Sequence, residues 1–238
     1  MAVVAMITAG GSGNRMHQDI PKQFLTVNEK PVIVYTLEAF EKHPEIDAVA
    51  VVCIEGWENV LRAYAKQFNI NKLQLVIPGG NTNYISIKNG VFELSRHFSG
   101  DDMVLIHDSI RPMVSPEIIS NCIRTAVKHG SAVTVIDCPE AMLTTEDGLI
   151  STGTYINFNL KRTQTPQAFY IKNICELYRR AEIAGITDAK APCSLMENLG
   201  EHIYFAVGSE KNIKLTTLDD IDIFKALLNT ERSSWLKS

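Results

Sequence analysis

A glycine-rich loop near the start of the chain contains the residue types that hold phosphate groups. It reads Ala9-Gly10-Gly11-Ser12-Gly13-Asn14-Arg15-Met16, and Pro21-Lys22-Gln23 follows shortly after. Glycines let backbone N–H groups approach phosphate oxygens closely, and nearby cations offset the phosphate charge. A plain turn between a strand and a helix would also use glycines, but it would not require Arg15 and Lys22. The loop therefore predicts a phosphate-binding site.

The spacing within this loop argues against two common nucleotide-binding motifs. The loop does not end in Gly-Lys-Ser or Gly-Lys-Thr, as a Walker loop would. It also lacks the G-x-G-x-x-G fingerprint of dinucleotide-binding proteins, which makes an NAD-dependent oxidoreductase a poor alternative.

Two further motifs follow predicted strands. Pro78-Gly79-Gly80-Asn81-Thr82 precedes Ser86, and the glycines either turn the chain or let its backbone approach a flat base. His107-Asp108-Ser109-Ile110-Arg111-Pro112 places a carboxylate at the end of a buried strand. Such a carboxylate needs a partner, which is either Arg111 or a Mg²⁺ ion carried by nucleotide phosphates. We interpret His107 as a packed residue and not as a base.

The last candidate segments lie late in the chain. They are Gln164-Thr165-Pro166-Gln167, Thr187-Asp188 and the β-type run Asn212-Ile213-Lys214-Leu215-Thr216. A lysine in such a run normally points to solvent. Lys214 belongs to a site only if the alternation of side chains along the run turns it towards that site.

Short apolar runs alternate with amphipathic stretches along the chain. Strands are expected at Val3–Thr8, Ala48–Cys53, Leu73–Ile77, Met103–Ile106, Ala132–Ile136 and His202–Val207. Helices are expected at Val32–Lys42, Asn59–Phe68, Tyr84–Arg96, Pro116 to the stop at Gly130, Ile171–Ala184, Ala191–Asn198 and from Thr217. This order predicts an α/β fold with a mostly parallel sheet and helices on both faces. Ligands then bind at the carboxyl ends of the strands, where the first three motifs lie.

The alternation breaks at residues 137–164, a polar stretch with a turn at Glu146-Asp147-Gly148. We interpret it as a hairpin-like arm on a single domain of residues 1–238. An arm of this kind needs a surface to pack on, and a second copy of the chain is the simplest candidate.

Composition favours a cytosolic protein. The chain has 238 residues with a net charge of −4, so a nucleic-acid-binding surface is not expected. Its five cysteines are scattered singly, which fits a reducing compartment better than a disulfide framework. The amino terminus does not have the pattern of a signal peptide, and the apolar runs are too short to span a membrane.

Taken together, these motifs resemble those of the cytidylyltransferases that activate ribitol phosphate or methylerythritol phosphate. The similarity extends from about Val4 to Leu228 and includes AGGSGNRM, PKQFL, HDSIRP, QTPQAF, TDA and NIKLTT in the family's order. It implies a Rossmann-like sheet, a dimer formed through the arm, and Mg²⁺-dependent transfer of CMP from CTP to a polyol phosphate.

The resemblance also implies roles for individual residues. Arg15, Lys22 and Lys214 are the expected catalytic residues, the first two on the triphosphate and Lys214 near the acceptor phosphate. The residues expected around the cytidine are Ala9, Gly10, Gly11, Gly80, Asn81, Ser86 and Ser109. Those expected at the acceptor are Asp108, Arg111, Glu140, Asn157, Thr165 and Thr187, with Asp108 also near the metal.

Two positions on the arm depart from the family pattern. Asn157 stands where the family usually has an arginine that reaches the partner's acceptor phosphate, and Glu140 stands where an aspartate is usual. Lys161 or Arg162 could substitute for the missing arginine. Because both departures lie at the acceptor, the resemblance implies CTP as donor and leaves three acceptors open. In order of preference they are ribitol phosphate, another polyol phosphate such as glycerol or hexitol phosphate for a surface polysaccharide, and methylerythritol phosphate.

Two other classes stay open at this point. One is a nucleotide-binding protein that has lost activity, although the presence of Arg15, Lys22, Asp108 and Lys214 argues against it. The other is a sugar-phosphate nucleotidyltransferase that uses UTP or another nucleotide, since the choice of CTP depends on the resemblance alone.

Overall fold

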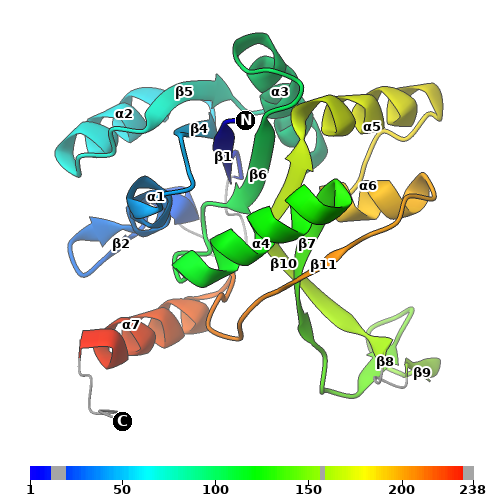
Figure 1. Ribbon diagram of the computed structural model, residues 1–238. Coiled ribbons are helices and arrows are strands. Elements are labelled where there is room, and N and C mark those ends of the chain that lie inside the picture. Colours follow the sequence, from blue (N-terminus) through cyan, green and yellow to red (C-terminus); the bar gives the residue numbers. More distant parts are fainter. Residues whose placement is uncertain (12–19, 156–158, 233–238) are drawn as a thin grey trace.

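A twisted seven-stranded sheet forms the centre of the protein (Figure 1). The computed structural model describes residues 1–11, 20–155 and 159–232. The strand order across the sheet is β11 (Phe205–Val207), β7 (Ser131–Asp137), β10 (Lys161–Tyr170), β6 (Met103–Asp108), β1 (Val3–Ala9), β4 (Ala48–Cys53) and β5 (Leu73–Pro78). Neighbouring strands pair in parallel except at β10, which is antiparallel to both β6 and β7. The predicted mostly parallel sheet is confirmed.

Helices cover both faces of this sheet, as the α/β prediction requires. The helices on one face are α1 (Val32–Lys42), α2 (Glu58–Gln67) and α4 (Pro116–His129), and those on the other are α3 (Asn83–His97), α5 (Ile171–Ile183) and α6 (Pro192–Asn198). Alternation along β1 explains the two cores. Ala5 and Ile7 pack in the first, whereas Val4 and Met6 pack in the second.

Local sequence determines where two helices begin. Ser115 Oγ accepts a hydrogen bond from the Ile118 amide at 3.3 Å at the start of α4, and Gly130 ends that helix with a φ of 89°. At the start of α7 (Leu218–Arg232), Asp220 accepts from the Thr217 amide at 2.8 Å. Thr217 Oγ1 accepts in return from the Asp220 amide at 3.3 Å. This reciprocal pair is a capping box with aspartate at its third helical position, and it starts the helix that was expected from Thr217.

Strand β10 is the main element that the sequence analysis did not predict. Pro166 argues against a central strand, because proline cannot donate to a ladder. The structure places Pro166 at an irregularity in the β10–β7 pairing, between Thr163 and Gln167. The β-type run at residues 212–216 is the opposite case. Its sequence resembles a strand, but the structure has no strand at these residues.

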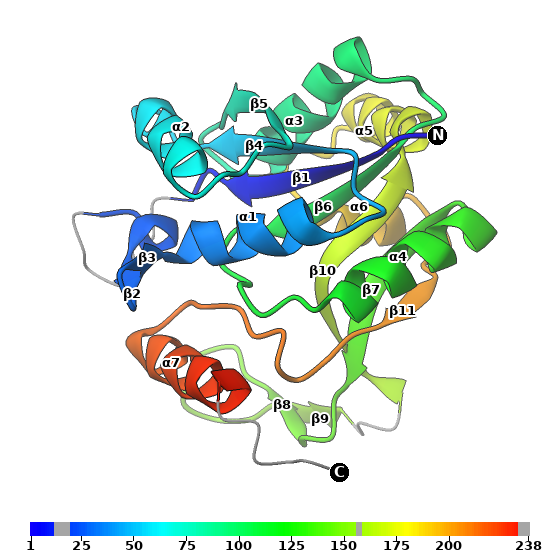
Figure 2. The same cartoon turned by 60° about the vertical axis from the view of Figure 1, so that its left-hand side comes forward.

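The arm carries a separate two-stranded sheet. Strands β8 (Met142–Thr144) and β9 (Gly153–Tyr155) pair antiparallel, and Figures 1 and 2 show them set apart from the central sheet. Between these strands, Leu149 is 88% exposed and Ile150 is 66% exposed. Another small sheet, β2 (Thr26–Val27) and β3 (Lys30–Pro31), follows the short 3₁₀ helix η2 (Lys22–Phe24).

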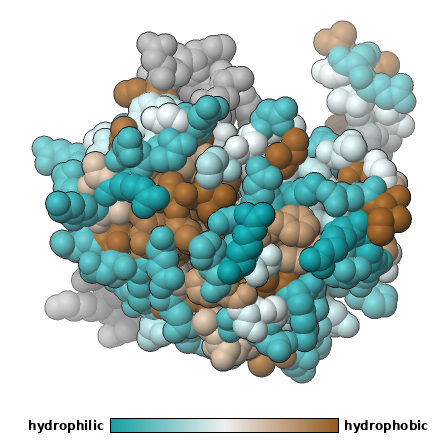
Figure 3. All heavy atoms as spheres, turned by 90° about the horizontal axis from the view of Figure 1, so that it is seen from above, coloured by the Kyte–Doolittle hydropathy of each residue, from teal (hydrophilic) through white to brown (hydrophobic). Residues whose placement is uncertain are grey.

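Polar side chains predominate on the face drawn in Figure 3, and hydrophobic atoms gather between them in smaller patches. Among the helices that the structure describes, none is long and apolar enough to cross a membrane.

Candidate active site

The carboxyl ends of the parallel strands meet at one edge of the sheet and enclose a cavity of about 440 Å³. The predicted site residues that line it are Gly10, Gly11, Lys22, Asp108, Ser109 and Lys214. Thr8, Gln23, Asn83, Ile110, Asp188, Ala189 and Lys190 complete the described lining. Residues from five separate parts of the chain therefore converge here, at the strand ends where the strand-end argument predicts a ligand site.

Gln23 holds the start of the glycine loop in place. Its side chain is buried, and Nε2 donates to the carbonyl oxygens of Ala9 at 2.8 Å and Gly11 at 3.1 Å. The next residue, Phe24, stacks on Trp57 with ring centroids 4.6 Å apart. Both anchors lie in the same short helix as Lys22, so Lys22 projects into the cavity from a fixed turn.

The second glycine pair lies beside the first loop. Ser86 is buried, and its hydroxyl accepts from the Gly80 amide at 3.0 Å and contacts the Gly80 carbonyl at 3.3 Å. An adjoining hollow of about 430 Å³ is lined by Gly10, Gly11, Ile54, Glu55, Gly79, Gly80, Asn81, Thr82, Asn83 and Ser86. The five residues Gly10, Gly11, Gly80, Asn81 and Ser86, predicted around the cytidine, thus share one surface.

The two neighbouring glycines of the first loop should respond differently to alanine. A Cβ on Gly10 would lie 2.9 Å from Ser86 Oγ, whereas one on Gly11 would meet no described atom within 4 Å. We expect Gly10→Ala to lower the melting temperature, because Ser86 must shift. Gly11→Ala should leave the melting temperature within about 1 °C and raise the KM for CTP, because its methyl group occupies space open to a ligand. Equal effects of both variants on stability would contradict this assignment.

Asp108 lies between two cations. Its Oδ2 is 3.0 Å from Arg111 Nε and 3.1 Å from Lys214 Nζ. Burial alone would raise the pKa of this carboxyl, but the charges of Lys214 and Arg111 outweigh burial and lower the pKa to about 2. Asp108 is therefore an anion throughout the physiological range. The pairing of Arg111 with Asp108, the simpler of the two alternatives for this carboxylate, is present in the structure.

His107 and Thr165 lie behind Asp108. His107 is fully buried, with Nε2 3.2 Å from the Arg111 carbonyl and Nδ1 3.1 Å from Thr165 Oγ1. Because a carbonyl only accepts, Nε2 carries the proton and Nδ1 accepts from the Thr165 hydroxyl. That hydroxyl in turn accepts from the Asp108 amide at 3.1 Å. The interpretation of His107 as a packed residue is confirmed.

The buried His107 should make the protein less stable in mild acid. Burial lowers its pKa from 6.5 to about 4, so below pH 6.5 the unfolded chain binds more protons than the folded chain. The free energy of unfolding should therefore fall as the pH is lowered from about 6.5 towards 4. Urea titrations of wild type and His107→Gln give the free energy of unfolding of each protein. The value for wild type minus the value for His107→Gln should be about 1–2 kcal/mol smaller at pH 5 than at pH 8. A difference that stays constant over this range would contradict the assignment.

The remaining predicted residues lie farther from the cavity or outside the described residues. Thr187 is exposed beside Asp188, which lines the cavity, and Glu140 is exposed at the base of the arm. Arg15 and Asn157 lie outside the described residues. Of the two residues considered as substitutes for an arginine at 157, Lys161 pairs with Asp137, and Arg162 binds both carboxylate oxygens of Glu210 at 2.6 and 2.5 Å.

Sequence reasoning missed three buried amides at this site, namely Gln23, Gln164 and Asn212. All three lie inside or next to motifs that were recognised. Their burial depends on tertiary contacts, so no local pattern identifies them.

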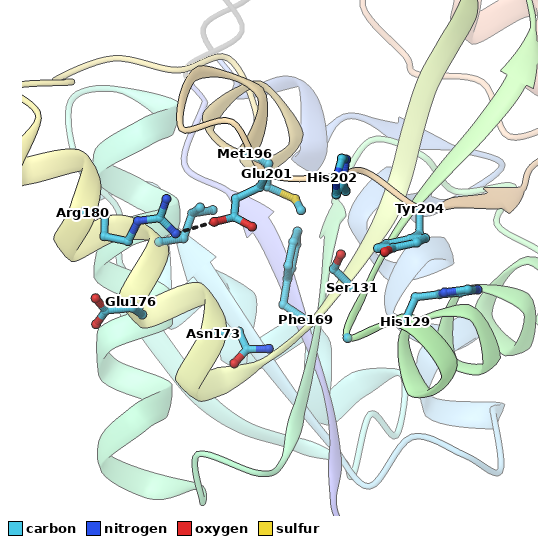
Figure 4. Close-up of a pocket in the computed structure, with 12 residues that line it drawn as sticks. His129, Ser131, Phe169, Asn173, Glu176, Arg180, Met196, Glu201, His202 and Tyr204 are labelled. Carbon is cyan, nitrogen blue, oxygen red and sulfur yellow. Dashed lines mark hydrogen bonds and ion pairs between the residues drawn. The ribbon is translucent and has the colours of Figure 1, made fainter.

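A second hollow lies at the opposite end of the strands (Figure 4). Ser131 and Phe169 form part of it, at the start of β7 and the end of β10. Tyr204 stacks on His129 on one side with ring centroids 4.3 Å apart, and Arg180 pairs with Glu201 on the other. The predicted site residues that the structure describes do not line this hollow.

Comparison with known proteins identifies the family. The model of the family described as "IspD: 2-C-methyl-D-erythritol 4-phosphate cytidylyltransferase" matches residues 3–230. A ribitol-5-phosphate cytidylyltransferase of Lacticaseibacillus paracasei is 44% identical, over 95% of this chain and 97% of the relative. A 2-C-methyl-D-erythritol 4-phosphate cytidylyltransferase of Geotalea uraniireducens is 32% identical, over 98% of this chain and 99% of the relative.

Solved structures show the same fold. The crystal structure of a 4-diphosphocytidyl-2C-methyl-D-erythritol synthase matches with a TM-score of 0.80 and 23% identity, over 95% of this chain and 98% of that one. The family model and the relatives above define the class of the protein, which is a nucleotidyltransferase. Within that class, the chain belongs to the IspD family of cytidylyltransferases.

Proposed function

We propose that this enzyme transfers CMP from CTP to D-ribitol 5-phosphate, giving CDP-ribitol and pyrophosphate. The observation that carries the proposal is the convergence of Lys22, Lys214, Asp108 and the glycine loop on one cavity. The relative named for ribitol 5-phosphate supports this acceptor, since its identity of 44% exceeds the 32% of the relative named for methylerythritol phosphate. The product would be an activated polyol, a form suited to building a surface polysaccharide.

The reaction needs no covalent intermediate on the enzyme. A phosphate oxygen of the acceptor attacks the α-phosphorus of CTP, the bond from that phosphorus to the bridging oxygen breaks, and pyrophosphate leaves with the electron pair. Lys22 would stabilise the charge on the leaving group, and Lys214 would hold the acceptor phosphate. Catalysis then depends on positioning and electrostatics. Lys22 and Lys214 both line the cavity, which is consistent with one lysine for the leaving group and one for the acceptor phosphate.

The site fits a Mg²⁺ ion that arrives with the nucleotide. Asp108 and Asp188 both line the cavity, and the low pKa of Asp108 keeps it ionised. The described residues contain no cluster of three carboxylate, imidazole or thiol groups that could hold a metal alone. Mg²⁺ commonly takes one or two carboxylates together with substrate phosphates, which is the donor set available here. When bound, the ion would offset the charge of the triphosphate.

The arm would join two copies of the chain. Leu143, Leu149 and Ile150 are 63%, 88% and 66% exposed on it, so the arm has apolar surface to bury. We expect a homodimer in light scattering of the purified protein. Leu149→Glu together with Ile150→Glu should shift the mass towards the monomer. A monomeric wild type at micromolar concentration would contradict the proposal.

The test of the function is pyrophosphate release with CTP and Mg²⁺. The panel contains the 5-phosphate of ribitol, methylerythritol 4-phosphate, glycerol phosphate and mannitol phosphate, and UTP replaces CTP as a control for the nucleotide. We expect release with CTP and ribitol 5-phosphate, at a kcat/KM at least tenfold above that with any other acceptor. Preference for another acceptor would overturn the ribitol assignment, and release with UTP alone would overturn the choice of nucleotide.

Asn157 should influence the choice of acceptor. The family's usual residue at this position is an arginine, so Asn157→Arg should change relative kcat/KM values across the acceptor panel. The KM for CTP should stay within about twofold of wild type, because the resemblance places residue 157 at the acceptor. A large change in the affinity for CTP would show that the arm has been assigned to the wrong substrate.

A further inference from the structure

The segment that carries Lys214 is placed by side-chain amides. Residues 208–216, here called the Lys214 loop, connect β11 to α7 without forming a strand or helix. Lys214 nevertheless meets Asp108 at 3.1 Å in the cavity. Backbone hydrogen bonds hold its two ends, from the Gly208 amide to the Val135 carbonyl and from the Leu215 amide to the Ile110 carbonyl, both at 2.9 Å. Between these ends the loop makes no strand ladder, so side-chain contacts must place the residues that lead to Lys214.

Gln164 of β10 provides the first of these contacts. Its side chain is 5% exposed, and Nε2 donates to the Ser209 carbonyl at 2.8 Å. Its Oε1 accepts from the Ser209 amide at 3.3 Å and from Asn212 Nδ2 at 3.2 Å. A Cβ on Gly208 would lie 2.5 Å from the same oxygen, so the loop is fitted closely to this amide. Gln164 thus binds the loop as a neighbouring strand would.

Asn212 provides the second contact and also holds Arg111, the residue that pairs with Asp108. Nδ2 of this fully buried residue also donates to the Thr165 carbonyl at 2.8 Å, and its backbone carbonyl accepts from Arg111 Nη1 at 2.8 Å. Arg111 in turn holds Asp108. Asn212 therefore fixes the start of the segment leading to Lys214 and, through Arg111, the carboxylate that Lys214 meets.

The unpaired oxygen of Asn212 shows that its donors are what matter. Oδ1 is buried and has no hydrogen-bond partner among the described residues. A buried oxygen without a partner costs about 1–3 kcal/mol. The amide cannot gain by turning over, because its oxygen would then face two acceptors, the Thr165 carbonyl and Gln164 Oε1. The two donor hydrogen bonds therefore determine how this amide is turned.

From these contacts we propose that Asn212 and Gln164 are positioning residues, which hold Lys214 opposite Asp108 for the acceptor phosphate. The inference rests on the proposed function, because it takes Lys214 as the residue that holds this phosphate. It adds that the position of Lys214 depends on the side-chain amides of Asn212 and Gln164, which carry no charge.

The main test is Asn212→Asp, which keeps the shape of the side chain and removes both donors. Asn71→Asp makes the same chemical change at an exposed position and serves as the matched control. With ribitol 5-phosphate, we expect Asn212→Asp to lower kcat/KM for the acceptor at least tenfold, with the KM for CTP within twofold of wild type. A parallel loss for both substrates would overturn the proposal, because it would indicate a general structural defect.

A double-mutant cycle shows whether Asn212 acts through Lys214. If it does, Asn212→Asp should have little further effect in a Lys214→Ala background, since the group it positions is gone. The same fold-loss in both backgrounds would overturn the proposal. Gln164→Met keeps the bulk of the side chain without its hydrogen bonds, and it should reproduce the kinetic pattern if Asn212→Asp does not fold.

Hydrogen exchange separates this inference from the proposed function. In Gln164→Met, amides of residues 209–215 should exchange at least tenfold faster, while those of β1 keep their wild-type rates. This measurement needs no substrate, so it stays decisive even if wild type releases no pyrophosphate with the panel. Unchanged exchange in the Lys214 loop would overturn the positioning role.

Discussion

Replacing Lys22 with alanine should lower kcat for pyrophosphate release by about 100- to 1000-fold, the usual effect of losing one group that stabilises developing charge. Lys22 lines the cavity from a short helix whose next two residues are anchored elsewhere. The substitution should therefore leave the helix in place. Steady-state kinetics and thermal melting of the same preparation test this expectation.

The matched control for this prediction is Lys66→Ala. Lys66 is an exposed lysine on α2 and does not line the cavity. Both variants should melt within about 2 °C of wild type, and only Lys22→Ala should lose turnover. If the loss of activity in Lys22→Ala followed a loss of folded protein, the catalytic role would be wrong.

Replacing Asp108 with asparagine should damage both stability and activity. Arg111 is only 9% exposed and would lose its charged partner, and removing one member of a buried ion pair costs roughly 3 kcal/mol. Lys214 would lose its partner as well, so we expect kcat to fall at least 100-fold. Urea denaturation and pyrophosphate release measure the two effects separately.

A second variant is the matched control for the loss of a carboxylate charge. Asp101→Asn removes an exposed carboxylate that pairs with Lys172, and it should leave the urea midpoint close to that of wild type, because exposed ion pairs add little stability. Full activity in Asp108→Asn would contradict a role for this carboxylate in the site. If Asp108→Asn lost no more stability than Asp101→Asn, Arg111 would have found another partner.

Much of the fold could be predicted because its determinants are local. The apolar runs that become β1, β4, β6 and β7 are buried on both faces, so they can be recognised as strands from a continuous apolar run without alternation. Ser115 and Gly130 determine both ends of α4. Strand β10 could not be recognised because Pro166 interrupts its pattern and its pairing irregularity is a tertiary feature.

The site could be predicted only in part, for a related reason. Gly10 and Asp108 stand out because they come at the ends of predicted buried strands, and Lys22 and Lys214 stand out as cations in recognisable motifs. The fold then brings all four to one cavity. Gln23, Gln164 and Asn212 do not stand out, since an amide in a loop is ordinary until its burial is known. Lys214 itself is in a run that was predicted to be β-like, but the run is held by side-chain hydrogen bonds and by one backbone hydrogen bond, from the Leu215 amide to the Ile110 carbonyl, in place of a ladder.

The insertion of β10 between β6 and β7 has a consequence for the order in which the chain can fold. Strands β1, β4, β5 and β6 lie within the first 108 residues and can pair as soon as they are made. Strand β7 has no neighbour until β10 and β11 follow, about 30 and 70 residues later. During synthesis it is an unpaired apolar strand, which is the kind of segment that associates with other chains. Strand β7, from which the arm begins, can therefore complete its pairing only after both β10 and β11 have been made.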